Sequence, residues 1–335
     1  MTNMKKLFSF FVATILCVMT TNAQQAVAVL SHDGTSKTFN GYNALQAAYA
    51  EAANGDLITL SSGTFGAVAN IEKAIKIHGA GMEMDTIYHT GPTMIVGDMR
   101  LNITDDGTNR FRLEGVYYYN NIAYMKNQIR PEFIKCRLYN IYGGKYTQQG
   151  TTYYGTIKDA LFYHCKVMSE LVCCENSSAT IINSYVGCPH SVNDTTSVFD
   201  IRNSVIAYPW SGVCLLSSTI SNSVLGSYFT YNQRTTFSNC LLPYNYNPDP
   251  SKNTYKNYEK LLEVFETYNN YSESDRDAED FMLYPAYNST YGIYSGSFPF
   301  SPRLAGPHIQ LMEVAPHSTD AGTLNVRIKI QNTTN

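Results

Sequence analysis

The sequence has little charge, a single tryptophan and, beyond its first residues, no long apolar run. Charged residues make up only 15% of the chain and the net charge is -3, so the chain lacks the basic surplus that attracts nucleic acid. A membrane-spanning helix needs about 18 or more apolar residues, and no stretch reaches that length. Hydrophobic residues nevertheless make up 44% of the chain, which excludes a disordered protein and provides for a large core.

The first residues have the pattern of an export leader. The basic pair Lys5-Lys6 precedes a thirteen-residue apolar run from Leu7 to Met19, and a polar stretch with small residues ends at Ala23. This run is too short for a membrane anchor but typical of a signal peptide. We therefore expect residues 1–23 to be cleaved near Ala23 and the protein to be secreted, periplasmic or on the cell surface, with no transmembrane segment.

Removal of the leader leaves seven cysteines, an odd number that excludes complete intramolecular pairing. No two of them have the C-x-x-C spacing with nearby histidines that a zinc site needs. A phosphate-binding glycine loop and a nucleophile elbow are also missing. The sequence thus predicts no metal and no cofactor, and it leaves the disulfide state open.

Three of these cysteines recur at one place in a repeated phrase, where the other repeats have serine or glycine. The position is occupied by Gly115, Cys136, Cys165, Ser184, Ser204, Ser223 and Cys240. The successive spacings are 21, 29, 19, 20, 19 and 17 residues, a period near twenty with one insertion. Helical repeats have longer periods, and the leucine-rich repeat has a leucine consensus that is missing here.

Each column of the repeat has a physical meaning. Three residues before the small position stand Phe133, Phe162, Ile181, Ile201, Ile220 and Phe237, and two residues after it stand Leu138, Val167, Val186, Ile206, Leu225 and Leu242. Inward positions of one strand are separated by even numbers, so inward residues at both columns and at the small position require a bend. Immediately before the small position stand Asn183, Asn203, Asn222 and Asn239. Asparagine tolerates the left-handed backbone that a tight bend needs, so short strands joined by bends are expected to stack.

The N-terminal part adds a cover for such a stack. Asn43 is expected to cap a helix with an apolar stripe, and Asn54-Gly55 to end it. The segments Ala44-Leu45-Gln46-Ala47-Ala48, Asn54-Gly55-Asp56-Leu57-Ile58, Gly63-Thr64-Phe65 and Ile77-His78-Gly79-Ala80-Gly81 resemble the opening of pectin-lyase-like right-handed β-helix proteins. The resemblance covers roughly residues 27–250 and implies a fold rather than an activity.

These patterns predict an all-β protein. Residues 24–305 are expected to form a right-handed parallel β-helix, a solenoid, with an N-terminal capping helix and an irregular closing segment. Residues 306–335 are expected to form a short C-terminal β segment, a cap or a stub, with strands from His308 to Val314 and from Leu324 to Gln331.

The candidate binding residues are those that break the Asn column. Lys135 and His164 stand where the other repeats have asparagine, and Arg137 and Lys166 follow the small position on the outward face. If the repeats stack in register, these four side chains form a basic patch near tyrosine-rich stretches at 117–119 and 139–154. The alternative is a solvated face without function.

Two functions remain open. The first is non-catalytic binding of a polysaccharide or cell-surface glycan, or a structural surface role, with no nucleic acid as partner. The second is a polysaccharide lyase or glycoside hydrolase acting on an acidic, uronate-containing glycan. The resemblance implies that lyases of this fold use Arg or Lys as base, with Ca²⁺ as the only expected cofactor. The lyase signatures and the paired acids of the related hydrolases are missing, so the sequence favours the non-catalytic function and assigns no catalytic residue.

Overall fold

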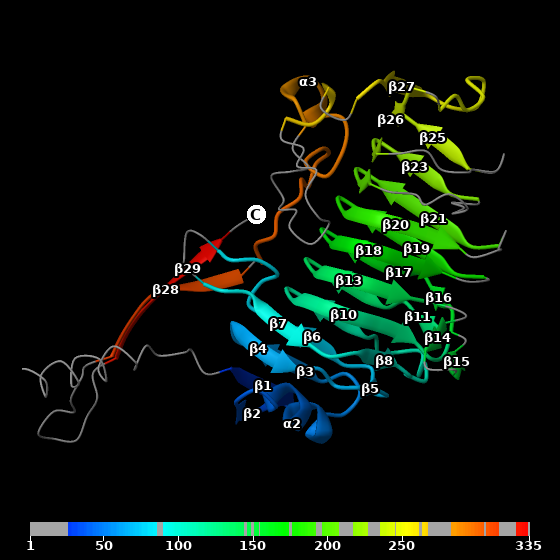
Figure 1. The fold of residues 1–335 in the computed structure, drawn as a ribbon. Helices are drawn as coiled ribbons and strands as arrows, with labels where there is room; N and C mark the ends of the chain where they lie inside the picture. Colours follow the sequence, from blue (N-terminus) through cyan, green and yellow to red (C-terminus); the bar gives the residue numbers. More distant parts are fainter. Residues whose placement is uncertain are drawn as a thin grey trace, which may run out of the picture.

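The computed structural model describes residues 26–85, 90–143, 146–148, 151–153, 155–173, 176–191, 196–207, 217–226, 235–244, 246–260, 263–266, 283–304, 306–314 and 326–333. The predicted leader lies outside these residues. Among these residues strands far outnumber helices, and most strands belong to two long, mainly parallel sheets (Figure 1). The expectation of a mostly-β protein is confirmed. Within the described ranges, no helix is both long and apolar enough to cross a membrane.

The first sheet, sheet A, has 11 strands among the described residues. Their order is β2 (Thr35–Asn40), β1 (Val27–His32), β3 (Leu57–Leu60), β6 (Lys76–His78), β9 (Arg112–Glu114), β12 (Glu132–Ile134), β17 (Ala160–Tyr163), β19 (Ser178–Ile182), β21 (Val198–Arg202), β23 (Thr219–Ser221) and β25 (Thr236–Ser238). Only β1 pairs antiparallel, with β2 and with β3.

The second sheet, sheet B, has 12 strands in the same part of the chain. Its main path is β4 (Gly63–Gly66), β7 (Thr93–Val96), β10 (Tyr117–Tyr124), β13 (Arg137–Tyr142), β18 (Lys166–Cys173), β20 (Tyr185–Ser191), β22 (Val205–Ile206), β24 (Val224–Leu225), β26 (Cys240–Pro243) and β27 (Tyr255–Tyr258). β5 (Asn70–Ile71) pairs with β8 (Met99–Leu101), and β8 pairs with β10.

Smaller elements complete the fold. The short pairs are β11 (Gln128–Ile129) with β16 (Ile157–Lys158), β14 (Tyr146–Gln148) with β15 (Thr151–Tyr153), and β28 (Gly306–Val314) with β29 (Val326–Thr333). The helices are α2 (Ala44–Glu51) and α3 (Pro285–Asn288). The two predicted C-terminal strands therefore exist and pair antiparallel. The proposed boundary at residue 306 stays a prediction.

The N-terminal cover differs from its prediction in two details. α2 buries Leu45 and Ala48, and it lies with β1 and β2 at the first end of the stack (Figure 1). Asn43 makes no side-chain capping bond, because its φ of -90° and ψ of 9° do not have the extended geometry of an N-cap. The helix also ends before Asn54-Gly55: its C-cap is Ala52, in an extended conformation, and Gly55, with φ of +89°, lies in the turn that follows.

From β9 onward the chain alternates between the two sheets. We call a rung each sheet-A strand together with the following bend and sheet-B strand. Every bend contains one residue in the left-handed region, and these form what we call the bend column: Gly115, Lys135, His164, Asn183, Asn203, Asn222 and Asn239, with φ between +45° and +64°. The predicted bend is confirmed, and it joins strands that stack in ascending sequence order.

The interior between the sheets is formed by the predicted columns. All twelve apolar residues of the two columns are buried, and so are the small residues between them. Phe133 and Phe162 stack with their ring centroids 5.0 Å apart. The hydroxyl of Ser184 accepts a bond from the Cys165 N–H on the rung before it (3.0 Å), and Ser204 serves Ser184 in the same way (3.2 Å). Buried serines thus satisfy backbone donors that the bend removes from the sheet ladders.

A second apolar cluster lies on the outer face of sheet B. It joins outward side chains of sheet B, among them Met168, Tyr185, Val205, Val224 and Leu241, to residues of the later chain, among them Phe265, Leu283, Tyr291, Ile293 and Phe300. The outer face of sheet B is therefore partly covered rather than solvated.

Candidate functional site

The segment 283–304, which we call the strap, runs along the bend column. In Figure 1 it is the orange chain that leaves α3 and descends beside the strand ends. Its contacts follow the column in reverse order. Gly292 donates its N–H to the Asn222 carbonyl (3.0 Å), and the Asn183 side-chain amide donates to the Ser295 carbonyl (2.9 Å). At the far end, the Leu304 side chain lies where a Cβ on Gly115 would stand.

Two of the four predicted binding residues hold the strap through their side chains. The Lys135 ammonium donates to the Arg303 carbonyl. His164 accepts the Ser301 N–H at Nδ1 (3.3 Å), so Nε2 carries the proton and donates to the Phe298 carbonyl (3.1 Å). Burial lowers the pKa of Lys135, and burial lowers the pKa of His164 to about 4. His164 is therefore neutral at physiological pH.

The other two predicted residues lie side by side on β13 and β18. Arg137 and Lys166 are register partners in the parallel pairing of these strands. The Arg137 guanidinium lies 4.9 Å from the centroid of the Tyr117 ring. The Lys166 side chain is 0% exposed, and its ammonium forms an ion pair with Glu83 and lies 5.9 Å from the centre of the Phe300 ring.

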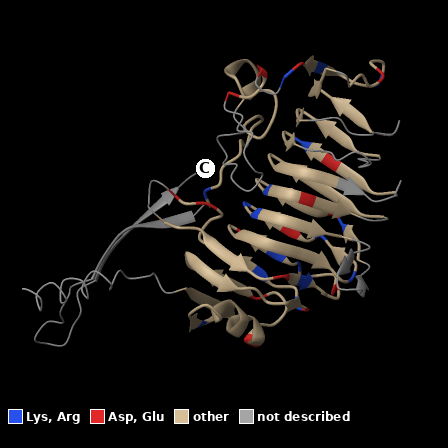
Figure 2. Cartoon of the chain, viewed as in Figure 1, with Lys and Arg blue, Asp and Glu red and all other residues tan. Residues whose placement is uncertain are grey.

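The sequence thus placed these four residues correctly on neighbouring rungs but wrongly at the surface. Lys135, Arg137, His164 and Lys166 are all buried. The strap contacts Lys135 and His164, Glu83 forms an ion pair with Lys166, and Arg137 packs on Tyr117. The prediction of a solvent-facing basic patch is wrong. Figure 2 marks the positions of the charged residues along the backbone of the described chain. Ligand binding by these four side chains stays a prediction, and their accessibility does not favour it.

The neighbouring tyrosines form the more accessible feature. Tyr119 and Tyr139 stack with ring centroids 5.6 Å apart and planes inclined by 21°, and Tyr117 meets Tyr119 edge to face at 6.2 Å. The Tyr119 side chain is 50% exposed, whereas Tyr117 and Tyr139 are half-buried. We call these three residues the tyrosine platform. It includes members of both tyrosine-rich stretches.

A break in strand register explains why Tyr119 faces outward. The pairing of β10 with β13 shifts between Tyr118 and Asn121, so β10 bends there. Tyr118 points inward and donates its hydroxyl proton to the Gly97 carbonyl. The Asn140 side-chain amide donates to Asn121 Oδ1 (3.0 Å), which ties the two rungs together at the bend. Tyr119 is therefore held out of the core by a rigid framework.

Two acidic residues lie beside the platform. Asp98 is exposed and accepts the Asn121 N–H at 3.3 Å. Glu170 is half-buried, and its N–H donates to the Asn140 side chain at 3.0 Å. The Arg137 guanidinium is buried against the Tyr117 ring. The surroundings of the platform therefore do not favour a negatively charged ligand.

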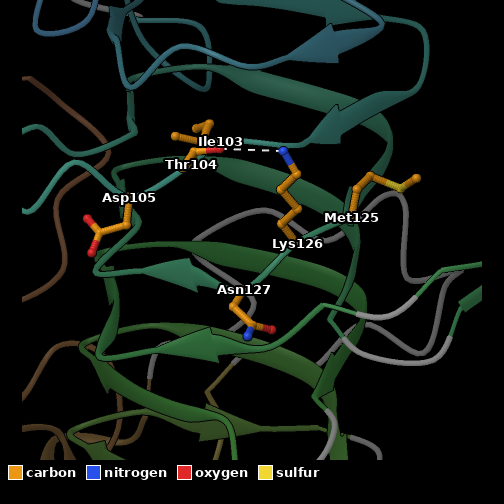
Figure 3. A pocket seen from close by; sticks show the side chains of 6 residues that line it. All are labelled: Ile103, Thr104, Asp105, Met125, Lys126 and Asn127. Atoms are coloured by element: carbon orange, nitrogen blue, oxygen red, sulfur yellow. Dashed lines mark hydrogen bonds between the residues drawn. The ribbon is translucent and has the colours of Figure 1, made fainter.

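A shallow groove lies just beyond the ends of the paired strands β8 and β10. It has a volume of about 380 Å³ and is lined by Ile103, Thr104, Asp105, Met125, Lys126 and Asn127 (Figure 3). The Lys126 ammonium donates to the Thr104 hydroxyl at 3.4 Å. Asp105 and Asp106 accept N–H groups of their own turn, at Gly107 (3.1 Å) and Thr108 (2.9 Å). The aspartates thus serve a turn, and the part of the chain that the structure describes contains no group of three or more acidic, His or Cys residues that could hold a metal.

The comparison with known proteins provides no further assignment. No family model matches the chain, and neither a curated protein nor a solved structure matches it. The resemblance to pectin-lyase-like proteins therefore stays a prediction from the residues quoted for it.

Proposed function

We propose that the chain is a secreted right-handed parallel β-helix protein that binds a polysaccharide without cleaving it. The binding surface is the tyrosine platform. The observation that carries the proposal is the exposed Tyr119, which stacks on the half-buried Tyr139 beside a hydrogen-bonded bend. Ascending strand order in two parallel sheets and the left-handed bend column support the β-helix, and the apolar run after Lys5-Lys6 supports export.

A tyrosine pair suits a sugar ring for a physical reason. One face of a pyranose carries mostly C–H bonds and packs on a flat aromatic ring, while the phenolic hydroxyl bonds the sugar hydroxyls. The rings are held by neighbours in adjacent rungs, so little side-chain entropy is lost on binding. The amides of Asn120 and Asn121 lie next to the platform in sequence and add polar groups of the kind that orient hydroxyl-rich ligands.

The charge distribution favours a neutral glycan. Asp98 and Glu170 flank the platform. Of the four basic residues, Arg137 is buried against Tyr117, and the other three contact the strap. A uronate chain would meet the carboxylates of Asp98 and Glu170, and like charges repel. The alternative function, a lyase or hydrolase for an acidic glycan, has less support because each basic side chain assigned to it already contacts other residues of the chain.

The test is binding of the purified protein to a panel of polysaccharides by affinity electrophoresis and calorimetry. The neutral arm contains β-glucan, mannan and xylan, and the acidic arm contains polygalacturonate and alginate. Tyr119→Ala is expected to weaken binding of a neutral glycan about tenfold, the equivalent of roughly 1.4 kcal/mol, whereas Tyr119→Phe keeps most of the affinity.

The matched control is Tyr244→Ala, which removes a tyrosine that is 62% exposed outside the platform. Equal affinities of the Tyr119→Ala and Tyr244→Ala variants would refute the platform as the binding site. Formation of an unsaturated product from a uronate glycan would instead establish the lyase alternative.

A further inference from the structure

Two buried cysteines occupy equivalent places on neighbouring rungs. Ile134 pairs with Tyr163 in sheet A, and Arg137 pairs with Lys166 in sheet B, so Cys136 lies opposite Cys165 in the same register. Both side chains are 0% exposed. Sheet-A pairing precedes the two cysteines and sheet-B pairing follows them, so the two rungs are in hydrogen-bonded contact on both sides of the cysteine pair.

The Cys165 thiol points toward the rung of Cys136, where it donates to the Phe133 carbonyl at 3.1 Å. The Cys136 thiol lies 3.2 Å from two carbonyls, that of Ile134 on its own rung and that of Leu113 on the rung before it. Both thiols are free in this structure, so joining them requires the Cys136 side chain to turn toward Cys165. Burial raises the pKa of Cys136, and the adjacent Cys165 thiol raises it further. Adjacent strands lie about 4.8 Å apart, within the Cα separation of about 4.4–6.8 Å that a disulfide spans.

We propose that Cys136 and Cys165 form a disulfide that joins the two rungs during folding in an oxidising compartment. The oxidant is a low-molecular-weight disulfide such as oxidised glutathione. One thiolate attacks it to give a mixed disulfide and releases one reduced thiol. The second protein thiolate then displaces the second glutathione thiol, so two protein thiols become one disulfide while one glutathione disulfide becomes two thiols. Oxidation precedes closure of the core, because both thiols are buried in the finished fold and cannot reach the oxidant.

The bond would strengthen the part of the protein that holds the strap. The rungs it joins carry Lys135 and His164, whose side chains bind the carbonyls of Arg303 and Phe298. It would also fix the two rungs that flank the inserted residues between Tyr142 and Ile157, where the repeat is least regular. The disulfide therefore stabilises the region in which local sequence signals are weakest.

The remaining described cysteines provide an internal control. Cys240 occupies the same place in its rung, but its register neighbour on the rung before it is Ser223, because Val224 pairs with Leu241. Cys188 lies opposite Glu170, and Cys173 lies opposite Ser191. Among the described cysteines, Cys136 and Cys165 are therefore the two that lie in register on neighbouring rungs.

The test is peptide mapping of the full chain after folding in a glutathione redox buffer. Free thiols are alkylated in denaturant, disulfides are then reduced, and the newly released thiols receive a second label. We expect Cys136 and Cys165 to carry the second label and Cys240 to carry the first. In a digest made before reduction, the peptides of Cys136 and Cys165 should be linked, with a mass about 2 Da below the sum of the two thiol peptides. Cys165→Ser should return Cys136 to the first label, whereas Cys240→Ser should leave the link intact. If Cys136 and Cys165 take the first label as fully as Cys240 does in the wild-type protein, the proposal is overturned, whatever the variants do.

Discussion

Asn183 connects the strap to the bend column, and its removal has a magnitude that the contacts allow to be worked out. Its side-chain amide donates to the carbonyls of Ile293 and Ser295, both at 2.9 Å. The Ile293 carbonyl also accepts the Phe300 N–H at 2.8 Å, so it keeps one partner. We therefore expect Asn183→Gly to lower the free energy of unfolding by about 2 to 3 kcal/mol, roughly 1 for the Ile293 bond and the rest for the Ser295 carbonyl.

Two further variants separate the side chain from the backbone. Asn183→Ala also removes a residue that tolerates the φ of +45°, which adds a cost of about 1 kcal/mol. Asn222→Gly makes the same backbone change at φ of +48°, but its side chain bonds Asn239 rather than the strap, so we expect a loss of less than about 1 kcal/mol. The assay is urea unfolding followed by far-ultraviolet circular dichroism. Equal stability of the Asn183→Gly and Asn222→Gly variants would refute the strap contact as a source of stability.

Two more predictions concern the strap. Because the folded-state pKa of His164, about 4, is below its unfolded value of 6.5, the unfolded chain binds its proton first as pH falls. Stability should thus be lost between pH 6.5 and 4, by up to about 3 kcal/mol more in the wild type than in His164→Asn, and parallel pH profiles in chemical denaturation would contradict this. Gly115→Ala should cost about 1 kcal/mol more than Gly107→Ala, because both have a φ near +70° but only the Cβ at 115 meets Leu304, at 2.6 Å. Equal thermal unfolding of these two variants would show that Leu304 does not pack on Gly115.

The repeat was predictable from the sequence because its constraints are local. An apolar residue three before the small position, another two after it and an asparagine between them leave one solution, a left-handed bend between two inward strands. The φ values of Asn183 and Asn203, +45° and +50°, are the direct result. Even Lys135 and His164, which lack the asparagine, adopt the same bend because their neighbours on both sides do.

The position of the strap was not predictable, since its contacts are distant in sequence and involve main-chain carbonyls. Asn183 and Ile293 are 110 positions apart, and a carbonyl acceptor has no counterpart in the pattern of side chains. The sequence pattern of the four basic residues therefore predicts a solvated patch, although the side chains of two of them donate hydrogen bonds to strap carbonyls. The tyrosine platform was only partly visible: the sequence indicates where tyrosines gather, but the register shift after Tyr118 decides which one is exposed.

The strap covers the bend column at Lys135 and His164, and lysine labelling of the native protein tests this directly. An amine-reactive acetyl ester is applied at low conversion, and the label at each lysine is measured by mass spectrometry. Lys252, with a side chain 67% exposed, should react readily, whereas Lys135 and Lys166 should react at less than about one tenth of its rate. Comparable labelling of Lys135, Lys166 and Lys252 would contradict the cover by the strap, since it would mean that Lys135 and Lys166 lie open to solvent.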